Sequence, residues 1–153
     1  MNELNLKDKV AVITGGAGII CSTFAKSLAA QGVKTVILDL NKDAADEVAI
    51  QIENEFKTSS IGVSASVLDK ASLEVAKKEI NERFGQIDIL INGAGGNSSA
   101  ATTRVEKMEG TTDENIEDTF FGLQIAGFDN VFDLNFKGTL IPSLVFATDM
   151  VRK

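Results

Sequence analysis

The chain has 153 residues, of which 44% are hydrophobic and 24% charged, and its formal net charge is −7 at pH 7. This length can bury the core of one domain, and the negative charge argues against nucleic acid or an anionic membrane as a partner. With one cysteine, no histidine and no tyrosine, the chain offers no internal disulfide, cysteine zinc cluster or histidine chemistry, and we expect no metal site. No secretory signal or membrane-spanning apolar run is evident, so we expect a cytoplasmic protein.

The first predicted unit is a strand, a glycine turn and a helix. The apolar run Val10–Ile13 has the length and β-branching of a buried parallel strand. Gly15, Gly16 and Gly18 then allow a tight turn and a close approach to a ligand, because they carry no Cβ. The next helix, residues 19–31, would direct its free N–H groups at this turn, which suits a pyrophosphate. Its apolar residues recur at helical spacing: Ile20, Phe24 and Leu28.

A second apolar strand, Thr35–Leu38, ends in Asp39, which lies 21 residues after Gly18. A carboxylate at this spacing accepts hydrogen bonds from an adenosine ribose and repels a 2′-phosphate. The combination predicts a site for a dinucleotide, and for NAD in preference to NADP. The alternative reading is a βαβ core whose glycine turn has no ligand.

Strands and helices continue to alternate after Asp39. We expect a helix from the N-cap Asn41 to Lys57, a strand over 61–67, a helix over 70–84 capped by Asp69, and a strand over 87–91. This alternation is typical of an α/β protein with a Rossmann-type doubly wound parallel sheet, in the strand order 3-2-1-4. Ligands of such sheets bind beyond the carboxyl ends of the strands, where four of the predicted loops converge. We expect one domain over residues 1–153.

The C-terminal third is predicted to hold a long loop and a long helix. Residues 93–127 are too many for an ordinary connection, and we interpret them as a lid, with partial disorder as the alternative. Within them, the sequence predicts a short helix over 111–120. The helix over 128–152 contains Pro142, where we expect a bend. Its apolar residues cover two sides. One side has Phe128, Val131 and Phe132, together with the polar Asn135, and the other has Phe136, Leu140, Leu144 and Val151. Two apolar sides predict a second helix as partner, from this domain or another subunit.

Four signatures, in this order and spacing, resemble the short-chain dehydrogenase/reductase family. They are Thr14-Gly15-Gly16, Asp39, Asn92-Gly-Ala-Gly95 and Asp133-Leu-Asn135-Phe-Lys-Gly-Thr139. Thr14 to Cys21, Asn92 to Asn97 and Ala101-Thr-Thr103 are similar to the D-mannonate oxidoreductase (fructuronate reductase) branch. The resemblance implies an NAD-dependent enzyme that interconverts D-mannonate and D-fructuronate by hydride transfer. It also implies a homo-oligomer, since complete relatives are commonly tetramers.

The resemblance implies roles for individual residues. Asn135 corresponds to the catalytic asparagine that holds a water in the proton relay. The residues implied for the cofactor are Thr14, Gly15, Gly16, Gly18, Ile19, Asp39, Leu40, Ser66, Val67, Asn92, Ala94 and Gly95.

The chain also departs from the family pattern. Ile19 and Cys21 stand where the family turn has glycines, Ser66 where it has an adenine-binding Asp, and Gly93 where it commonly has Asn. We interpret Cys21 as a packing residue. The family's catalytic Ser and Tyr-x-x-x-Lys follow the Asn helix, and this chain ends at Lys153 with no tyrosine. We therefore expect the N-terminal portion of such an enzyme, inactive by itself. The alternatives are a non-catalytic nucleotide-binding or self-associating half-domain, and a dehydrogenase for another sugar or polyol.

Overall fold

The computed structural model describes residues 5–107 and 115–151. Its centre is a parallel sheet of β1 (Val10–Thr14), β2 (Lys34–Asp39), β3 (Ser60–Ser64) and β4 (Ile89–Asn92) in the order β3-β2-β1-β4. The predicted fold class and strand order are thus confirmed. Thr14 is level with Leu38 on one side and with Asn92 on the other, so the carboxyl ends of the three strands form one edge.

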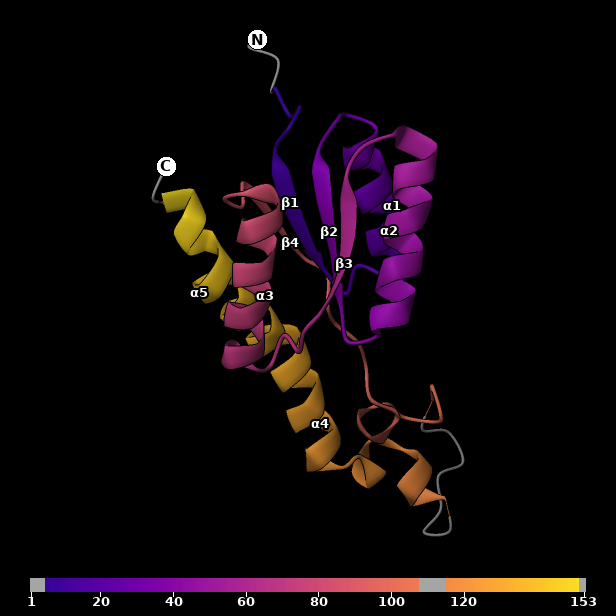
Figure 1. The fold of residues 1–153 in the computed structure, drawn as a ribbon. Coiled ribbons are helices and arrows are strands. Elements are labelled where there is room, and N and C mark those ends of the chain that lie inside the picture. The colour runs from indigo at the N-terminus through magenta and orange to yellow at the C-terminus, as the bar shows by residue number, and fades with distance from the viewer. Residues whose placement is uncertain (1–4, 108–114, 152–153) are drawn as a thin grey trace.

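Helices cover both faces of the sheet (Figure 1). α1 (Ile19–Ala29) and α2 (Lys42–Phe56) pack on one face, and α3 (Lys70–Phe84) and α5 (Gly138–Val151) on the other. The alternation of β1 separates the two cores, since Ala11 and Ile13 join the first and Val10 and Val12 the second. All residues of β1 are buried, as expected of a parallel strand covered on both faces.

The buried stripe of α1 differs from the predicted one. Ile20 and Phe24 are 69% and 49% exposed, whereas Cys21, Ala25 and Ala29 face the core. Small side chains let the helix axis lie close to β1 and β2, so Ile20 and Phe24 remain outside. Of the predicted stripe only Leu28 packs against the core.

Several element boundaries also need correction. β3 ends at Ser64 and not at Val67, because Ala65 N–H makes the last bond to Asp39 O and the chain then turns into α3. β4 begins at Ile89 and not at Ile87, whose N–H donates to Asp149 instead of to a neighbouring strand. α1 ends at Ala29, two residues earlier than predicted, and Gly32 in the turn beyond has a φ of +80°.

The predicted long helix is three consecutive pieces. α4 (Ile125–Phe132) starts earlier than expected and continues through a π-helical turn, Asp133–Lys137, into α5. The interruption of the α-helical pattern lies at this π turn, whereas we expected a bend at Pro142, which is buried inside α5. Of the two apolar sides, the one with Phe136, Leu140, Leu144 and Val151 is exposed, as is Phe132.

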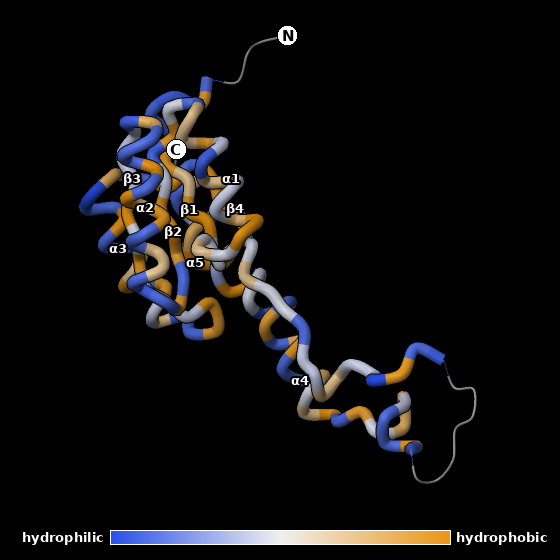
Figure 2. Tube along the Cα trace, turned by 90° about the vertical axis from the view of Figure 1, so that its right-hand side faces the viewer, coloured by the Kyte–Doolittle hydropathy of each residue, from blue (hydrophilic) through white to orange (hydrophobic). Residues whose placement is uncertain are grey.

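The segment between β4 and α4 projects beyond the carboxyl edge of the sheet (Figures 1 and 2). It contains short 3-10 turns at Ser99–Ala101, Ile116–Asp118 and Phe120–Gly122. The predicted helix over 111–120 therefore has only 3-10 structure in its described part, and its first residues, 111–114, lie outside that part. In the described ranges no helix has the length and apolarity to cross a bilayer.

Candidate functional site

The glycine turn after β1 is enclosed by backbone. Gly15 has a φ of +61°, and a Cβ there would lie 2.9 Å from Ala94 Cα. A Cβ on Gly16 would lie 2.8 Å from Ile13 O, and Gly16 N–H donates to Leu38 O at 3.1 Å. The turn thus packs between β2 and the loop after β4, and its first two glycines have no space for a side chain.

The start of α1 is open to a ligand. Gly18 is the N-cap residue, no side chain caps the helix, and no acidic residue lies in the first turn. The side chain of Ile19 is 89% exposed at this end. An uncapped N-terminus offers free N–H groups and the positive end of the helix dipole, which suits an anion.

Asp39 contacts the glycine turn directly. Its Oδ2 accepts a hydrogen bond from Ala17 N–H at 3.2 Å, and its Oδ1 accepts one from Asn41 N–H at 3.1 Å. The structure therefore brings the predicted ribose-binding carboxylate and the predicted pyrophosphate turn together. Leu40, the next predicted contact, is 73% exposed beside them.

Thr14 links β1 to the loop after β4. Its buried Oγ1 accepts hydrogen bonds from Gly93 N–H at 3.1 Å and Ala94 N–H at 3.2 Å. Asn92 Nδ2 donates to Ser143 Oγ of α5 at 3.0 Å, and its buried Oδ1 has no hydrogen-bond partner among the described residues. These contacts hold the predicted nicotinamide side of the crevice against β1 and α5.

Asn135 lies in the π turn and contacts the same loop. Its Oδ1 accepts from Gly96 N–H at 3.2 Å, and its Nδ2 donates to Gly96 O at 2.7 Å and to Val131 O at 2.8 Å. A Cβ on Gly95 would lie 2.7 Å from Asn135 Oδ1. Asn135 therefore joins the helix to the loop at the crevice.

Ser66 and Val67 lie in the turn between β3 and α3. Ser66 Oγ accepts from Leu68 N–H at 3.3 Å, and Ser66 N–H donates to Ser72 Oγ at 3.2 Å. Val67 is buried, and a Cβ on Gly138 would lie 3.1 Å from its Cγ2. Both residues are at the carboxyl edge of the sheet, with Ser66 Oγ already engaged by the local backbone.

Cys21 and Gly93, noted separately in the sequence, are in contact. A Cβ on Gly93 would overlap Cys21 Sγ and would lie 2.9 Å from Thr14 O. Cys21 is 7% exposed, and burial, together with the negative charge of Asp39, raises the pKa of its thiol above the ordinary value. These findings support a packing role, and no sequence pattern pointed to the pairing itself.

The segment before α4 folds back on itself. Arg104 N–H donates to Asp118 O at 3.0 Å, its guanidinium pairs with the Asp118 carboxylate at 3.2 Å, and Gln124 N–H donates to Ala100 O at 2.9 Å. A polar cavity of about 820 Å³ lies between these two backbone segments. The assignment of residues 93–127 as a lid stays a prediction.

In the part of the chain that the structure describes, no three His, Cys, Asp or Glu side chains group as a metal site.

The parallel sheet with its switch between β1 and β4, and the loops gathered at that switch, define a Rossmann-type α/β domain. The family model for short chain dehydrogenase matches residues 9–153. The chain belongs to the short-chain dehydrogenase family.

Known proteins match this chain over nearly all of its length. An uncharacterised oxidoreductase from Haemophilus influenzae is 42% identical over 97% of this chain, and the uncharacterised oxidoreductase UxuB from Bacillus subtilis is 41% identical over 97%. A crystal structure from Haemophilus, provisionally assigned as a D-mannonate oxidoreductase and containing bound NAD, has 42% identity and a TM-score of 0.89 over 95% of this chain. The chain spans about half the length of these relatives, 52%, 52% and 51% respectively.

Proposed function

We propose that this chain binds NAD at the carboxyl edge of the sheet, as the cofactor-binding half of an NAD-dependent oxidoreductase. The observation that carries the proposal is the hydrogen bond between Asp39 and Ala17 N–H, which fixes an acid beside an uncapped helix N-terminus. This arrangement matches a pyrophosphate on the turn and a ribose diol on the carboxylate. The NAD bound to the Haemophilus structure supports the same assignment.

The residues of the crevice divide by the part of NAD that each would contact. Gly15, Gly16, Gly18 and Ile19 would hold the pyrophosphate, and Thr14 would act indirectly, through the Gly93–Ala94 loop that it anchors. Asp39 and Leu40 would contact the adenosine ribose, and Ser66 and Val67 the adenine. Asn92, Ala94 and Gly95 would line the path to the nicotinamide. The residues that carry these proposed roles lie on four loops at one edge of the sheet.

We further propose that the substrate pair is D-mannonate and D-fructuronate, with the hydride passing between a substrate carbon and the nicotinamide. Support comes from the 42% identity to the Haemophilus structure and from the motifs around Cys21 and Asn97. Asn135 would hold the relay water, near Gly96 where its amide now binds the loop. The exposed apolar side of α4 and α5 supports a homo-oligomer.

The 153-residue chain is expected to bind cofactor without turnover, because the family's acid/base is a tyrosine and this chain contains none. Steady-state oxidation of NADH with D-fructuronate tests this expectation directly. Measurable turnover by a chain of verified mass would show that another residue transfers the proton. A panel of other sugar acids and polyols in the same assay tests the substrate class once a longer protein is used.

The binding test compares NADH with NADPH by fluorescence titration of the chain. Wild type should prefer NADH by at least about tenfold, and Asp39→Ala should reduce that preference by about tenfold, since the variant removes the repulsion of the 2′-phosphate. Glu55→Ala is the control, because it removes the same charge from the exposed far end of α2. A preference for NADPH, or an unchanged ratio in Asp39→Ala, would overturn the site. No binding of either nucleotide, with a large oligomer by light scattering, would favour the self-associating alternative.

A further inference from the structure

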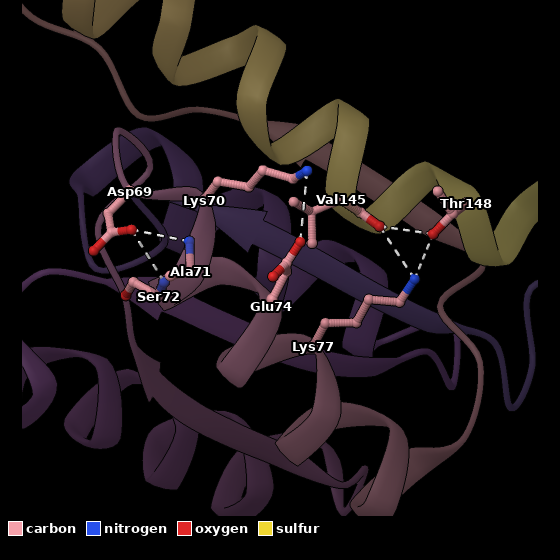
Figure 3. Close-up of polar contacts among 8 residues, drawn as sticks. All are labelled: Asp69, Lys70, Ala71, Ser72, Glu74, Lys77, Val145 and Thr148. Atoms are coloured by element: carbon pink, nitrogen blue, oxygen red, sulfur yellow. Dashed lines mark hydrogen bonds and ion pairs between the residues drawn. The ribbon is translucent and has the colours of Figure 1, made fainter.

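A buried ion pair joins α3 to α5 outside the cofactor crevice. Lys77 Nζ lies 2.6 Å from Asp149 Oδ1, and their side chains are only 17% and 6% exposed. Lys77 Nζ also donates to Val145 O at 3.1 Å and to Thr148 Oγ1, as Figure 3 shows. The ammonium group therefore has three acceptors, all from the last two turns of α5.

Asp149 extends this contact to the sheet. Its Oδ2 accepts from Ile87 N–H at 3.2 Å, just before β4, and the side chain of Asn81 in α3 also donates to it. A single carboxylate on α5 thus receives hydrogen bonds from α3 and from the segment just before β4. We name Lys77, Asn81, Ile87 N–H and Asp149 the α3–α5 node.

The setting of the node is apolar. Val145, Phe146, Ile80 and Ile87 pack in the same core. Replacing a buried ion pair with apolar residues of similar volume is often neutral or stabilising, so stability alone gives a weak reason for this pair. Apolar contacts have little direction, and a helix displaced by one turn, about 5.4 Å, can make similar ones. Polar groups with fixed partners exclude such a displacement.

The other end of the same helix tolerates little displacement. Asn135, in the π turn directly before α5, makes two hydrogen bonds with Gly96 and lies so close to Gly95 that no Cβ fits between them. Gly138, the first residue of α5, packs against Val67. The position of α5 along its axis therefore decides whether Asn135 reaches the loop.

We propose that Lys77 and Asp149 are positioning residues, which set the axial position of α5 and so hold Asn135 on the Gly95–Gly96 loop. The proposal rests on the proposed function only for its consequence on cofactor binding. The placement of Asn135 itself is a property of the chain without cofactor.

The test removes both charges with Lys77→Met/Asp149→Leu. The control is Lys70→Met/Glu74→Leu, which removes an exposed ion pair of 3.6 Å within α3 and introduces the same two residue types (Figure 3). Both variants are melted, and hydrogen exchange of the Asn135 side-chain amide is followed by NMR without NAD. We expect cooperative melting near the wild-type temperature in both, and amide exchange at least about tenfold faster only in the node variant.

Wild-type exchange of Asn135 in a folded node variant would overturn the proposal. If that variant does not fold, Asp149→Asn decides, because it keeps the volume and an acceptor for Ile87 N–H but loses the charge. Faster Asn135 exchange in Asp149→Asn supports the proposal, and unchanged exchange overturns it. NADH titration of the same variants then separates the positioning role of Lys77 and Asp149 from the proposed NAD site. Faster Asn135 exchange with unchanged NADH affinity would support the positioning role and would exclude only its effect on cofactor binding.

Discussion

Cys21 Sγ occupies the space next to Gly93 in which a side chain would otherwise begin. The two residues lie 72 positions apart, one in the first turn of α1 and the other directly after β4. Each departs from the common pattern of the family, which has a glycine at the first position and an asparagine at the second. A sulfur at position 21 leaves room only for glycine at position 93. The two departures from the family pattern, Cys21 and Gly93, are therefore coupled by packing.

This relationship predicts that the effect of a substitution at Gly93 depends on residue 21. Gly93→Ala should cost about 2 kcal/mol of unfolding free energy in the wild type, the usual cost of overpacking. In a Cys21→Gly background the same substitution should cost less, by about 1 kcal/mol or more, although Thr14 O at 2.9 Å keeps part of the strain. Urea denaturation of the four proteins measures the coupling. Gly96→Ala is the control, because its Cβ would meet nothing closer than Leu134 Cδ2 at 3.6 Å. Equal costs in both backgrounds would contradict the pairing.

The buried position of Cys21 predicts that its thiol reacts slowly with reagents in solution. Burial comes first and the charge of Asp39 second in raising its pKa above 9.0, so little thiolate forms at neutral pH. Ellman's reagent should react at least about 100-fold more slowly than with a free thiol, and denaturant should release one thiol per chain. Cys21→Ala/Ser27→Cys, with its thiol on the exposed side of α1, is the reactive control. Rapid labelling of native wild type near pH 7 would exclude the enclosed geometry.

We predict that substitution of Thr14 lowers the free energy of unfolding by more than the size of its side chain suggests. Thr14→Val keeps the shape of the side chain but removes the acceptor of two amide groups, Gly93 N–H and Ala94 N–H. Leaving these part-buried donors unpaired should cost about 1 to 2 kcal/mol, and the loop at the nicotinamide side should exchange its amide protons faster. Thr23→Val on the exposed face of α1 should change the free energy of unfolding by less than about 0.5 kcal/mol. Hydrogen exchange at 93 and 94 equal to wild type would show that another acceptor replaces Thr14.

The sequence predicted those features that depend on local signals or on alternation. α3 has the predicted bounds, because Asp69 accepts from the N–H groups of Ala71 and Ser72 and Gly85 ends the helix with a φ of +85°. The strand order followed from the regular alternation of strands and helices. These signals are contained within a few residues or in the pattern of the whole chain.

Features decided by contacts between distant segments were not predictable. The π turn around Asn135 has no local signature, and the contacts of Asn135 with Gly96 and Gly95 are visible only in the folded chain. Phe24 outweighs Ala25 on any hydrophobicity scale, yet Ala25 is buried because helix and sheet are close there. The α3–α5 node likewise depends on residues from α3, from α5 and from the segment before β4. Of the candidate site, the sequence identified the loops, and the structure supplied how each loop is anchored.

We predict that the free energy of unfolding at acidic pH depends on the ionisation of Asp149. Burial raises the pKa of this carboxyl, but hydrogen bonds from Lys77, Ile87 N–H and Asn81 and the charge of Lys77 outweigh burial, and the net pKa is lowered below 3.8. Because the folded pKa is the lower one, the contribution of the charged group is complete above 3.8 and is lost as the pH falls through the folded pKa. Asp149→Asn should cost about 3 kcal/mol at pH 7. That difference should shrink by up to about 1.4 kcal/mol per pH unit below pH 4. Urea denaturation of both proteins from pH 6 to pH 2 measures it, with exposed Asp129→Asn as control. A difference that stays constant between pH 4 and pH 2 would mean that Asp149 does not titrate with a lowered pKa in the folded chain.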